Sequence, residues 1–104
     1  MDVAVQDNPQ EHRYEVREDG RLAGFVQYRR TGSRITMIHT EIDPRFEGRG
    51  LGSELARAAL ADIRAQGLEL VPVCPFIAAY VRRHPDEYLD LVAAGSRERV
   101  MAGG

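Results

Sequence analysis

Two kinds of hydrophobic spacing divide the chain into an early region of strands and a central helix. Apolar and polar residues alternate in residues 13–17, and residues 22–30 and 34–42 read as two further strands. Alternation of this kind is typical of strands that are buried on one side. Asp19-Gly20 and Thr31-Gly32-Ser33 are short turn sequences between these segments, and Asp43-Pro44 ends the third. The pattern therefore predicts three antiparallel strands in a meander.

A spacing of four residues replaces the alternation after residue 49. The apolar residues on this spacing are Leu51, Leu55, Ala59 and Ile63. Positions 54, 57, 61 and 64 fall on the opposite face. This predicts one amphipathic helix over residues 50–66. Gly67 then stands where a left-handed residue commonly ends a helix.

The remaining segments complete a mixed sheet. Residues 68–73 read as a fourth strand, residues 76–84 as a short helix that ends at His84-Pro85, and residues 88–92 as one further turn. A strand, a glycine turn, a helix and a strand form a crossover unit, which makes the last strand parallel to its neighbour. The expected fold class is α/β, a mixed antiparallel/parallel sheet with packed helices.

The predicted domain spans residues 12–92. Residues 1–11 are polar, so a flexible N-terminal arm without regular structure is expected there, and residues 93–104 are expected to form a frayed C-terminal tail. A chain of 104 residues with 43% hydrophobic content fits one domain with its own core.

Charge and composition exclude several classes of partner. The net charge is −2, from 14 basic and 16 acidic residues, which favours neither nucleic acid nor an anionic membrane as partner. No apolar run approaches the roughly 20 residues that cross a bilayer. The N-terminus lacks the features of a signal peptide, and the lone Cys74 rules out an intramolecular disulfide. A cytoplasmic protein is therefore expected.

Glycines alternate between the third strand and the helix, at positions 48, 50 and 52. Alternate glycines let a backbone approach a ligand closely, and the helix start adds free N–H groups and partial positive charge. Together these features predict a pyrophosphate-binding loop. The expected binding residues are Glu47, Gly48, Arg49, Gly50, Leu51, Gly52 and Ser53.

Two common nucleotide-binding motifs fit the loop less well. A Walker loop needs lysine, and every basic residue of this chain is arginine. A dinucleotide fingerprint needs glycine where Ser53 stands and a larger parallel sheet. A purely structural glycine turn stays as an alternative.

The loop resembles that of the GNAT acetyltransferases, whose signature Gln/Arg-x-x-Gly-x-Gly/Ala opens the central helix. Residues 47–52 match it at Gly50 and Gly52, while Glu47 places a carboxylate where Gln or Arg is usual. Across residues 12–92 the chain looks most similar to small single-domain GNAT-like proteins. The elements that carry this likeness are Ile38-His39-Thr40-Glu41, Val73-Cys74-Pro75-Phe76-Ile77 and His84-Pro85 with Glu87-Tyr88. The resemblance implies binding of CoA or acetyl-CoA as co-substrate and an unidentified amine acceptor.

A GNAT-like reaction needs a base, and strand periodicity supplies two candidates. Period two places Ile35, Met37, His39 and Glu41 on one face of the third strand. His39 and Glu41 therefore neighbour each other just before the glycine loop, and a strand glutamate near this position serves as base in the superfamily. The alternative is a hydrogen-bonded His–Glu pair that only orders the sheet.

Three further groups have both a functional and a structural interpretation. Cys74 closes the fourth strand, where it accepts an acyl group as a nucleophile or packs as a small buried residue. Tyr80, by resemblance, protonates the CoA sulfur, or else belongs to the core. The arginines Arg45, Arg49, Arg82 and Arg83 contact CoA phosphates or are solvated surface charges. No metal site is expected.

Three functions remain open from the sequence. The first is an N-acetyltransferase that moves an acetyl group from acetyl-CoA to an amine, by direct attack or through Cys74. The second is a CoA- or acyl-CoA-binding module without turnover. The third is a structural interaction domain that keeps the loop without using it.

Overall fold

A computed structural model describes residues 2–103 and contains one five-stranded sheet. The strands are β1 Val3–Asn8, β2 Arg13–Glu18, β3 Arg21–Thr31, β4 Arg34–Ile42 and β5 Glu69–Pro72. They lie side by side in chain order; β1 to β4 are antiparallel and β5 runs parallel to β4. This is the mixed sheet that the sequence predicts, and β4 has the predicted bounds.

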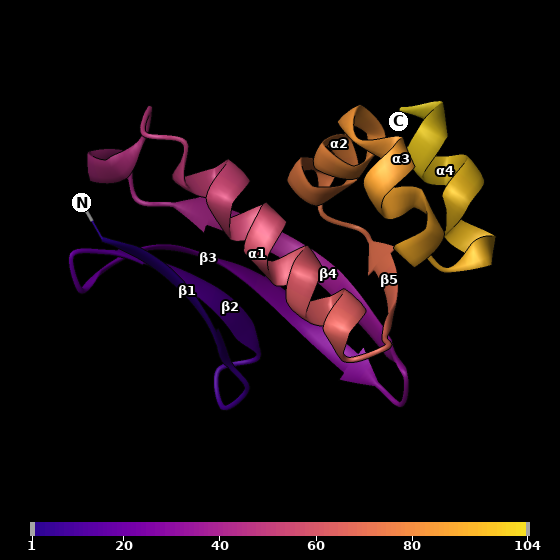
Figure 1. The fold of residues 1–104 in the computed structure, drawn as a ribbon, viewed down its shortest axis with the longest axis horizontal. Helices are drawn as coiled ribbons and strands as arrows, with labels where there is room; N and C mark the ends of the chain where they lie inside the picture. The colour runs from indigo at the N-terminus through magenta and orange to yellow at the C-terminus, as the bar shows by residue number, and fades with distance from the viewer. Residues whose placement is uncertain (1, 104) are drawn as a thin grey trace.

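The helices lie on one face of the sheet and at one end of it. They are α1 Leu51–Ala65, α2 Pro75–Arg83, α3 Pro85–Tyr88 and α4 Arg97–Ala102, with 3-10 turns at Pro44–Phe46, Leu89–Leu91 and Ala94–Ser96. Figure 1 shows α1 running across the sheet, while α2, α3 and α4 gather near β5, far from the N-terminus. Among residues 2–103, no helix has the length and apolar content needed to cross a membrane.

The core forms where the apolar stripe of α1 meets the sheet. Leu55, Ala59 and Ile63 are fully buried, opposite sheet residues such as Val26 and Met37. Beyond the helix, Gly67 adopts φ +70°. The N–H of Leu68 reaches the carbonyl of Ile63 at 3.1 Å, and the N–H of Gly67 reaches that of Arg64 at 3.0 Å. These two bonds complete a Schellman cap, which confirms the predicted end of the helix.

The N-terminal segment is not an unstructured arm. Residues 3–8 form β1 and pair with β2 along their whole length. The hydroxyl of Tyr28 donates a 2.6 Å hydrogen bond to Asp7 and ties β1 to β3. Most β1 side chains are exposed, so hydrophobic alternation could not reveal it. The expectation of no regular structure there is wrong, because backbone pairing with β2 forms this strand.

The C-terminal segment is also ordered. Residues 97–102 form α4, where Val100 is only 4% exposed and its carbonyl accepts a hydrogen bond from Arg82. The expected frayed tail is therefore wrong for α4, because one buried side chain and this bond hold it against α2. Just before it, the N–H of Ala93 donates to the carbonyl of Leu70 at 2.8 Å on the outer edge of β5. The domain limits at residues 12 and 92 stay a prediction.

A β-bulge in β4 shifts the alternation of its side chains. Odd-numbered residues point to the core before the bulge, and even-numbered residues do so after it. Gln27 pairs with His39 and Tyr28 with Met37, so Ile38 is an extra residue on β4. Before the bulge Met37 points into the core; after it Thr40 points that way and His39 is exposed. The prediction that Ile35, Met37, His39 and Glu41 share a face is wrong for this reason, although His39 and Glu41 still share one.

Candidate functional site

The loop before α1 presents a run of free backbone N–H groups. Gly48 and Gly50 have φ angles of +80° and +75°, a left-handed conformation that glycine adopts without strain. None of the N–H groups of residues 48–53 donates a hydrogen bond to another described residue, whereas Glu54 already bonds to the Gly50 carbonyl. Six consecutive donors at the start of a 15-residue helix form a surface that fits an anionic oxygen group. The residues present therefore fit a pyrophosphate.

Gly52 differs from the other two loop glycines. It lies in the first turn of α1, where an added Cβ would stand 3.0 Å from the ring of Phe76 on α2. A side chain at this position would require the ring to move by a few tenths of an ångström. Gly52 therefore joins the loop to α2 by packing, which the sequence alone did not indicate.

Charged side chains surround the loop. Asp43 caps the turn before it, and the side-chain hydrogen bond from Arg45 holds the pKa of Asp43 down to about 2. Arg49 pairs with Glu18, a buried carboxylate at the end of β2 whose second oxygen has no partner among the described residues. Both guanidinium groups line a hollow of about 180 Å³ beside the loop. Glu47, between them, is exposed.

The two parallel strands part beside this loop. Their pairing ends where Met37 lies opposite Pro72, and the carbonyl of Met37 then accepts hydrogen bonds from both Val73 and Cys74. Beyond that point β4 continues to Ile42 while the chain turns away into α2. The structure therefore has a divergence of β4 and β5 next to Cys74.

Cys74 faces the core side of this divergence. It is 2% exposed, and its sulfur lies 3.1 Å from the hydroxyl oxygen of Thr40 on β4. One of these two groups donates a hydrogen bond to the other. The thiol is thus enclosed and partnered, while the neighbouring Val73 is 54% exposed on the other side of the strand.

His39 and Glu41 lie on the opposite face of the sheet, away from α1. Their Nε2 and Oε2 atoms are 3.4 Å apart, and both side chains are more than half exposed. The ring of Phe25 on β3 contacts His39 with centroids 6.5 Å apart. Glu41 and Phe25 also line a cavity of about 280 Å³ that ends at Pro44. A proton acceptor therefore stands beside a space that a small molecule can enter.

Tyr80 belongs to a separate aromatic cluster between α2 and α3. Its ring lies 4.8 Å from that of His84 and 5.7 Å from that of Tyr88. Burial and the neighbouring Tyr80 raise the pKa of Tyr88. In residues 2–103, no hydrogen bond, ion pair or ring contact joins Tyr80 to His39, Glu41 or Cys74. The candidate groups therefore occupy three places.

The four candidate arginines also separate. Arg45 and Arg49 flank the glycine loop, each with an acidic partner. Arg83 lies over the Tyr80 ring, and Arg82 donates to the Val100 carbonyl on the other side of α2. Arg45 and Arg49 therefore lie beside the loop, whereas Arg82 and Arg83 lie on α2.

Three residues of this region escaped the sequence analysis. Thr40 was assigned no role, since its partner Cys74 is 34 positions away. Phe76 has a place in the predicted helix and in the family likeness, but its close contact with Gly52 appears only in the fold. Glu18 lies just outside the predicted strand 13–17, and only the folded hairpin shows it to be 4% exposed against Arg49.

Comparison with known proteins agrees with this geometry. A model of the GCN5-related N-acetyltransferase family matches residues 13–91. Protein NATD1 of Mus musculus is 31% identical over 91 residues, covering 85% of this chain and 83% of that protein. Protein NATD1 of Homo sapiens is 30% identical, with 85% and 80% covered. A GCN5-like protein of Staphylococcus aureus, solved by NMR, superposes with a TM-score of 0.62 at 21% identity, over 86% of this chain and 87% of that one. The glycine loop, the parted strands and the family match together place this chain in the GCN5-related N-acetyltransferase family.

Proposed function

We propose that this protein is an acetyl-CoA-dependent N-acetyltransferase that transfers an acetyl group to a small-molecule or protein amine. The observation that carries the proposal is the run of unpaired N–H groups at residues 48–53, next to the point where β4 and β5 part. Membership of the GCN5-related N-acetyltransferase family also supports acetyl-CoA as the acetyl donor. Acetyl-CoA would supply the activated acetyl group, and the loop would bind its pyrophosphate.

His39 and Glu41 are the groups that we assign to proton removal. A 3.4 Å His–Glu pair at the water-exposed sheet face can take a proton from an incoming ammonium and pass it to solvent. The cavity of about 280 Å³ beside Glu41 offers room for the acceptor. In the transfer, a nitrogen–carbon bond forms, the carbon–sulfur bond breaks, and the departing sulfur takes a proton.

Direct attack needs no rearrangement of Cys74. The covalent alternative requires the thiol to leave its contact with Thr40 and its enclosed position. Tyr80 stays the candidate that family resemblance suggests for protonating the leaving sulfur. For this role the Tyr80 hydroxyl would have to point toward the CoA sulfur while the Tyr80 ring stays packed against His84 and Tyr88.

A second function, CoA binding without turnover, is favoured by one observation. The candidate catalytic groups lie in three separate places, with Cys74 buried and Tyr80 stacked on other rings. The loop needs none of them to bind a pyrophosphate. Binding and turnover must therefore be measured separately.

The decisive experiment has two stages. The first measures thermal unfolding with CoA and acetyl-CoA; ligand at one hundred times its dissociation constant should add about 2.7 kcal/mol to the stability. The second incubates the protein with acetyl-CoA and a panel of primary amines and follows acetylated amine by mass spectrometry. Glu41→Gln should lower the rate about 100-fold without changing CoA affinity.

A matched control is Glu69→Gln, an exposed glutamate that pairs with Arg34 at the other end of β4. It should leave the rate unchanged. If CoA binds but no amine is acetylated, the function is CoA binding without turnover. No binding of either CoA species would reject both functions.

A further inference from the structure

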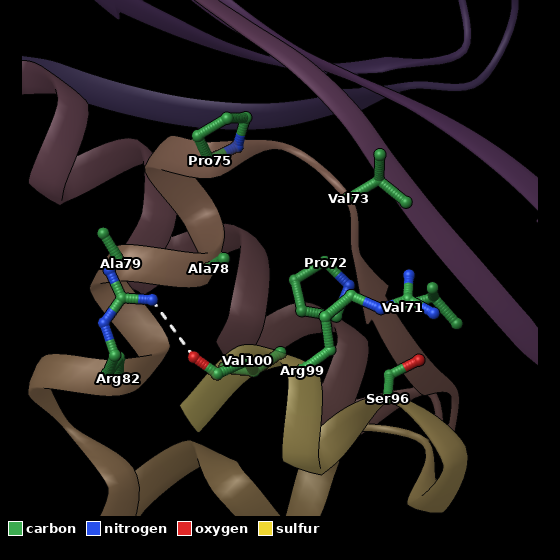
Figure 2. A pocket seen from close by; sticks show the side chains of 10 residues that line it. All are labelled: Val71, Pro72, Val73, Pro75, Ala78, Ala79, Arg82, Ser96, Arg99 and Val100. Carbon is green, nitrogen blue, oxygen red and sulfur yellow. Dashed lines mark hydrogen bonds between the residues drawn. The ribbon is translucent and has the colours of Figure 1, made fainter. Parts of the chain in front are cut away.

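A cavity away from the glycine loop lies on the far side of α2. It has a volume of about 460 Å³ and lies between the end of β5, α2 and α4. Figure 2 shows the side chains that line it. This volume falls within the range of pockets that hold small organic ligands. None of the residues around the glycine loop or the His39–Glu41 pair takes part in it.

Most of the wall is apolar. Seven of the ten lining residues are Val, Pro or Ala, among them Val71, Val73, Ala78 and Val100. Val73, directly after β5, is 54% exposed and presents apolar surface to the cavity. Covering this wall would remove apolar surface from water. The wall therefore favours a ligand with a hydrocarbon part.

Two of the three polar residues that line the cavity are cationic, and the third is Ser96. Arg82 enters from α2 and Arg99 from α4, on two sides of the view in Figure 2, and no acidic residue lines the cavity. Arg82 donates to the Val100 carbonyl at 3.1 Å near the end of α4, where the helix carries partial negative charge. Arg99 makes no hydrogen bond or ion pair to any residue from 2 to 103. Arg99 is therefore available to a carboxylate.

We propose that this cavity is a binding site for a small apolar carboxylate, with its hydrocarbon part against Val73 and Ala78 and its carboxylate on Arg99. A guanidinium can hold a carboxylate through two parallel hydrogen bonds. The remaining N–H groups of Arg82 add a second cation at the same cavity. The site is independent of acetyl transfer, so its test requires neither CoA nor an amine.

The experiment compares three probes of one chain length: octanoate, octylammonium and octan-1-ol. Each is titrated into the ¹⁵N-labelled protein at low millimolar concentration, and amide shifts are followed by NMR. Octanoate should shift the amides of Val73, Ala78, Ala79 and Val100 and bind at least about 10-fold more tightly than octylammonium. Equal binding of the two ions, or octanoate shifts confined to other residues, would overturn the proposal.

Charge variants of Arg99, with Arg83 as the control, test the role of the cation directly. Arg99→Gln should weaken octanoate about 10-fold and leave octan-1-ol unchanged, because only the charged contact is lost. Arg83→Gln removes the same charge from α2 at a residue outside the cavity and should leave octanoate affinity unchanged. Arg99→Glu should reverse the preference toward octylammonium, and an unreversed preference would contradict the site.

A filling variant and a mass measurement complete the design. Ala78→Leu should block all three probes while the amide spectrum stays dispersed. Sedimentation of the free protein should give the mass of a monomer. In a monomer the cavity is open to the probes. A stable dimer whose interface protects Val73 and Val100 from exchange would mean that a second copy covers this face, and would overturn the small-molecule assignment.

Discussion

The hydroxyl of Thr40 lies 3.1 Å from the thiol of Cys74 and joins β4 to the start of α2 across the gap between the parted strands. A buried thiol with a hydrogen-bond partner is a poorer nucleophile than a thiolate in an exposed, electropositive place. We therefore expect Cys74 to help hold the strands in position while the amine attacks the acetyl group directly.

Replacement of Cys74 tests this expectation. Cys74→Ser keeps a small polar group beside Thr40 and should reduce the acetylation rate by no more than a few-fold. Intact-mass analysis after incubation with acetyl-CoA should show no acetyl group on the wild-type thiol. The chain has no lysine, so side-chain amines do not complicate the spectrum. A hydroxylamine-sensitive acetyl group that disappears in Cys74→Ala and transfers to an amine would establish the covalent route instead.

Gly50 has a φ angle of +75° and is the N-cap of α1, directly before the first residue of the helix. Gly50→Val should abolish CoA binding, because a β-branched residue strongly resists that conformation and would move the N–H groups. Gly32→Val is the matched control, since Gly32 has φ +60° and equally open surroundings in the β3–β4 turn. It should lose similar stability but bind CoA normally by calorimetry. Unchanged CoA affinity in a folded Gly50→Val protein would refute the loop assignment.

The exposed carboxylate of Glu47 begins the loop signature. If it faces the bound phosphates it repels them, so Glu47→Gln should tighten CoA binding several-fold at about 10 mM salt. The gain should shrink near 150 mM, where the Debye length falls to about 8 Å. Calorimetry at both salt concentrations measures this, with Glu69→Gln as the distant control. Equal affinities of Glu47→Gln and wild type at low salt would mean that the side chain points away.

The 3.0 Å approach of Phe76 to Gly52 predicts an unusual response to alanine. In most helix positions Gly→Ala stabilises by up to about 1 kcal/mol. Here the added methyl collides with the ring, so Gly52→Ala should lower the stability by about 1 kcal/mol. In a Phe76→Leu background the same change should stabilise. Chemical denaturation of the four proteins gives the answer, and additive effects would show that the ring moves aside freely.

Two buried tyrosines predict a loss of stability at alkaline pH. Burial, with hydrogen bonds to Asp62 and Asp7, raises the pKa of Tyr14 and of Tyr28 well above the ordinary value of 10.0. The folded state therefore holds these protons to a higher pH than the unfolded chain. The contribution of the two tyrosines to the free energy of unfolding is complete below about pH 10 and falls as the pH rises above it. Denaturation between pH 8 and 11 should show this fall, reduced in Tyr14→Phe; an identical slope in that variant would contradict the assignment.

The sequence predicted the central part of the fold because its signals there are local and repeated. The four-residue spacing in 50–66 indicates a helix, and the alternation in 13–17 with the turn sequences that follow indicates the meander of strands. β1 escaped prediction because its stability comes from pairing with β2 and from the Tyr28–Asp7 bond. α4 escaped because its six residues depend on one buried side chain, Val100.

The candidate site was harder to predict for a geometric reason. Strict alternation breaks at the adjacent apolar residues Met37 and Ile38, but that break alone does not distinguish a bulge from an ordinary exposed isoleucine. That single extra residue turns His39 to the open face and brings Thr40 to Cys74. Sequence could name the side chains, but their grouping depends on strand register, which is set by long-range pairing.

The bond from Ala93 to Leu70 has a consequence for how this protein behaves at high concentration. A last strand with unpaired backbone groups invites a strand from a neighbouring molecule, which is a common start of aggregation. On β5 the Leu70 carbonyl is already occupied, and Pro72, two residues further along the same edge, has no N–H to offer. The strand is also only four residues long. This edge of the sheet therefore resists edge-to-edge association.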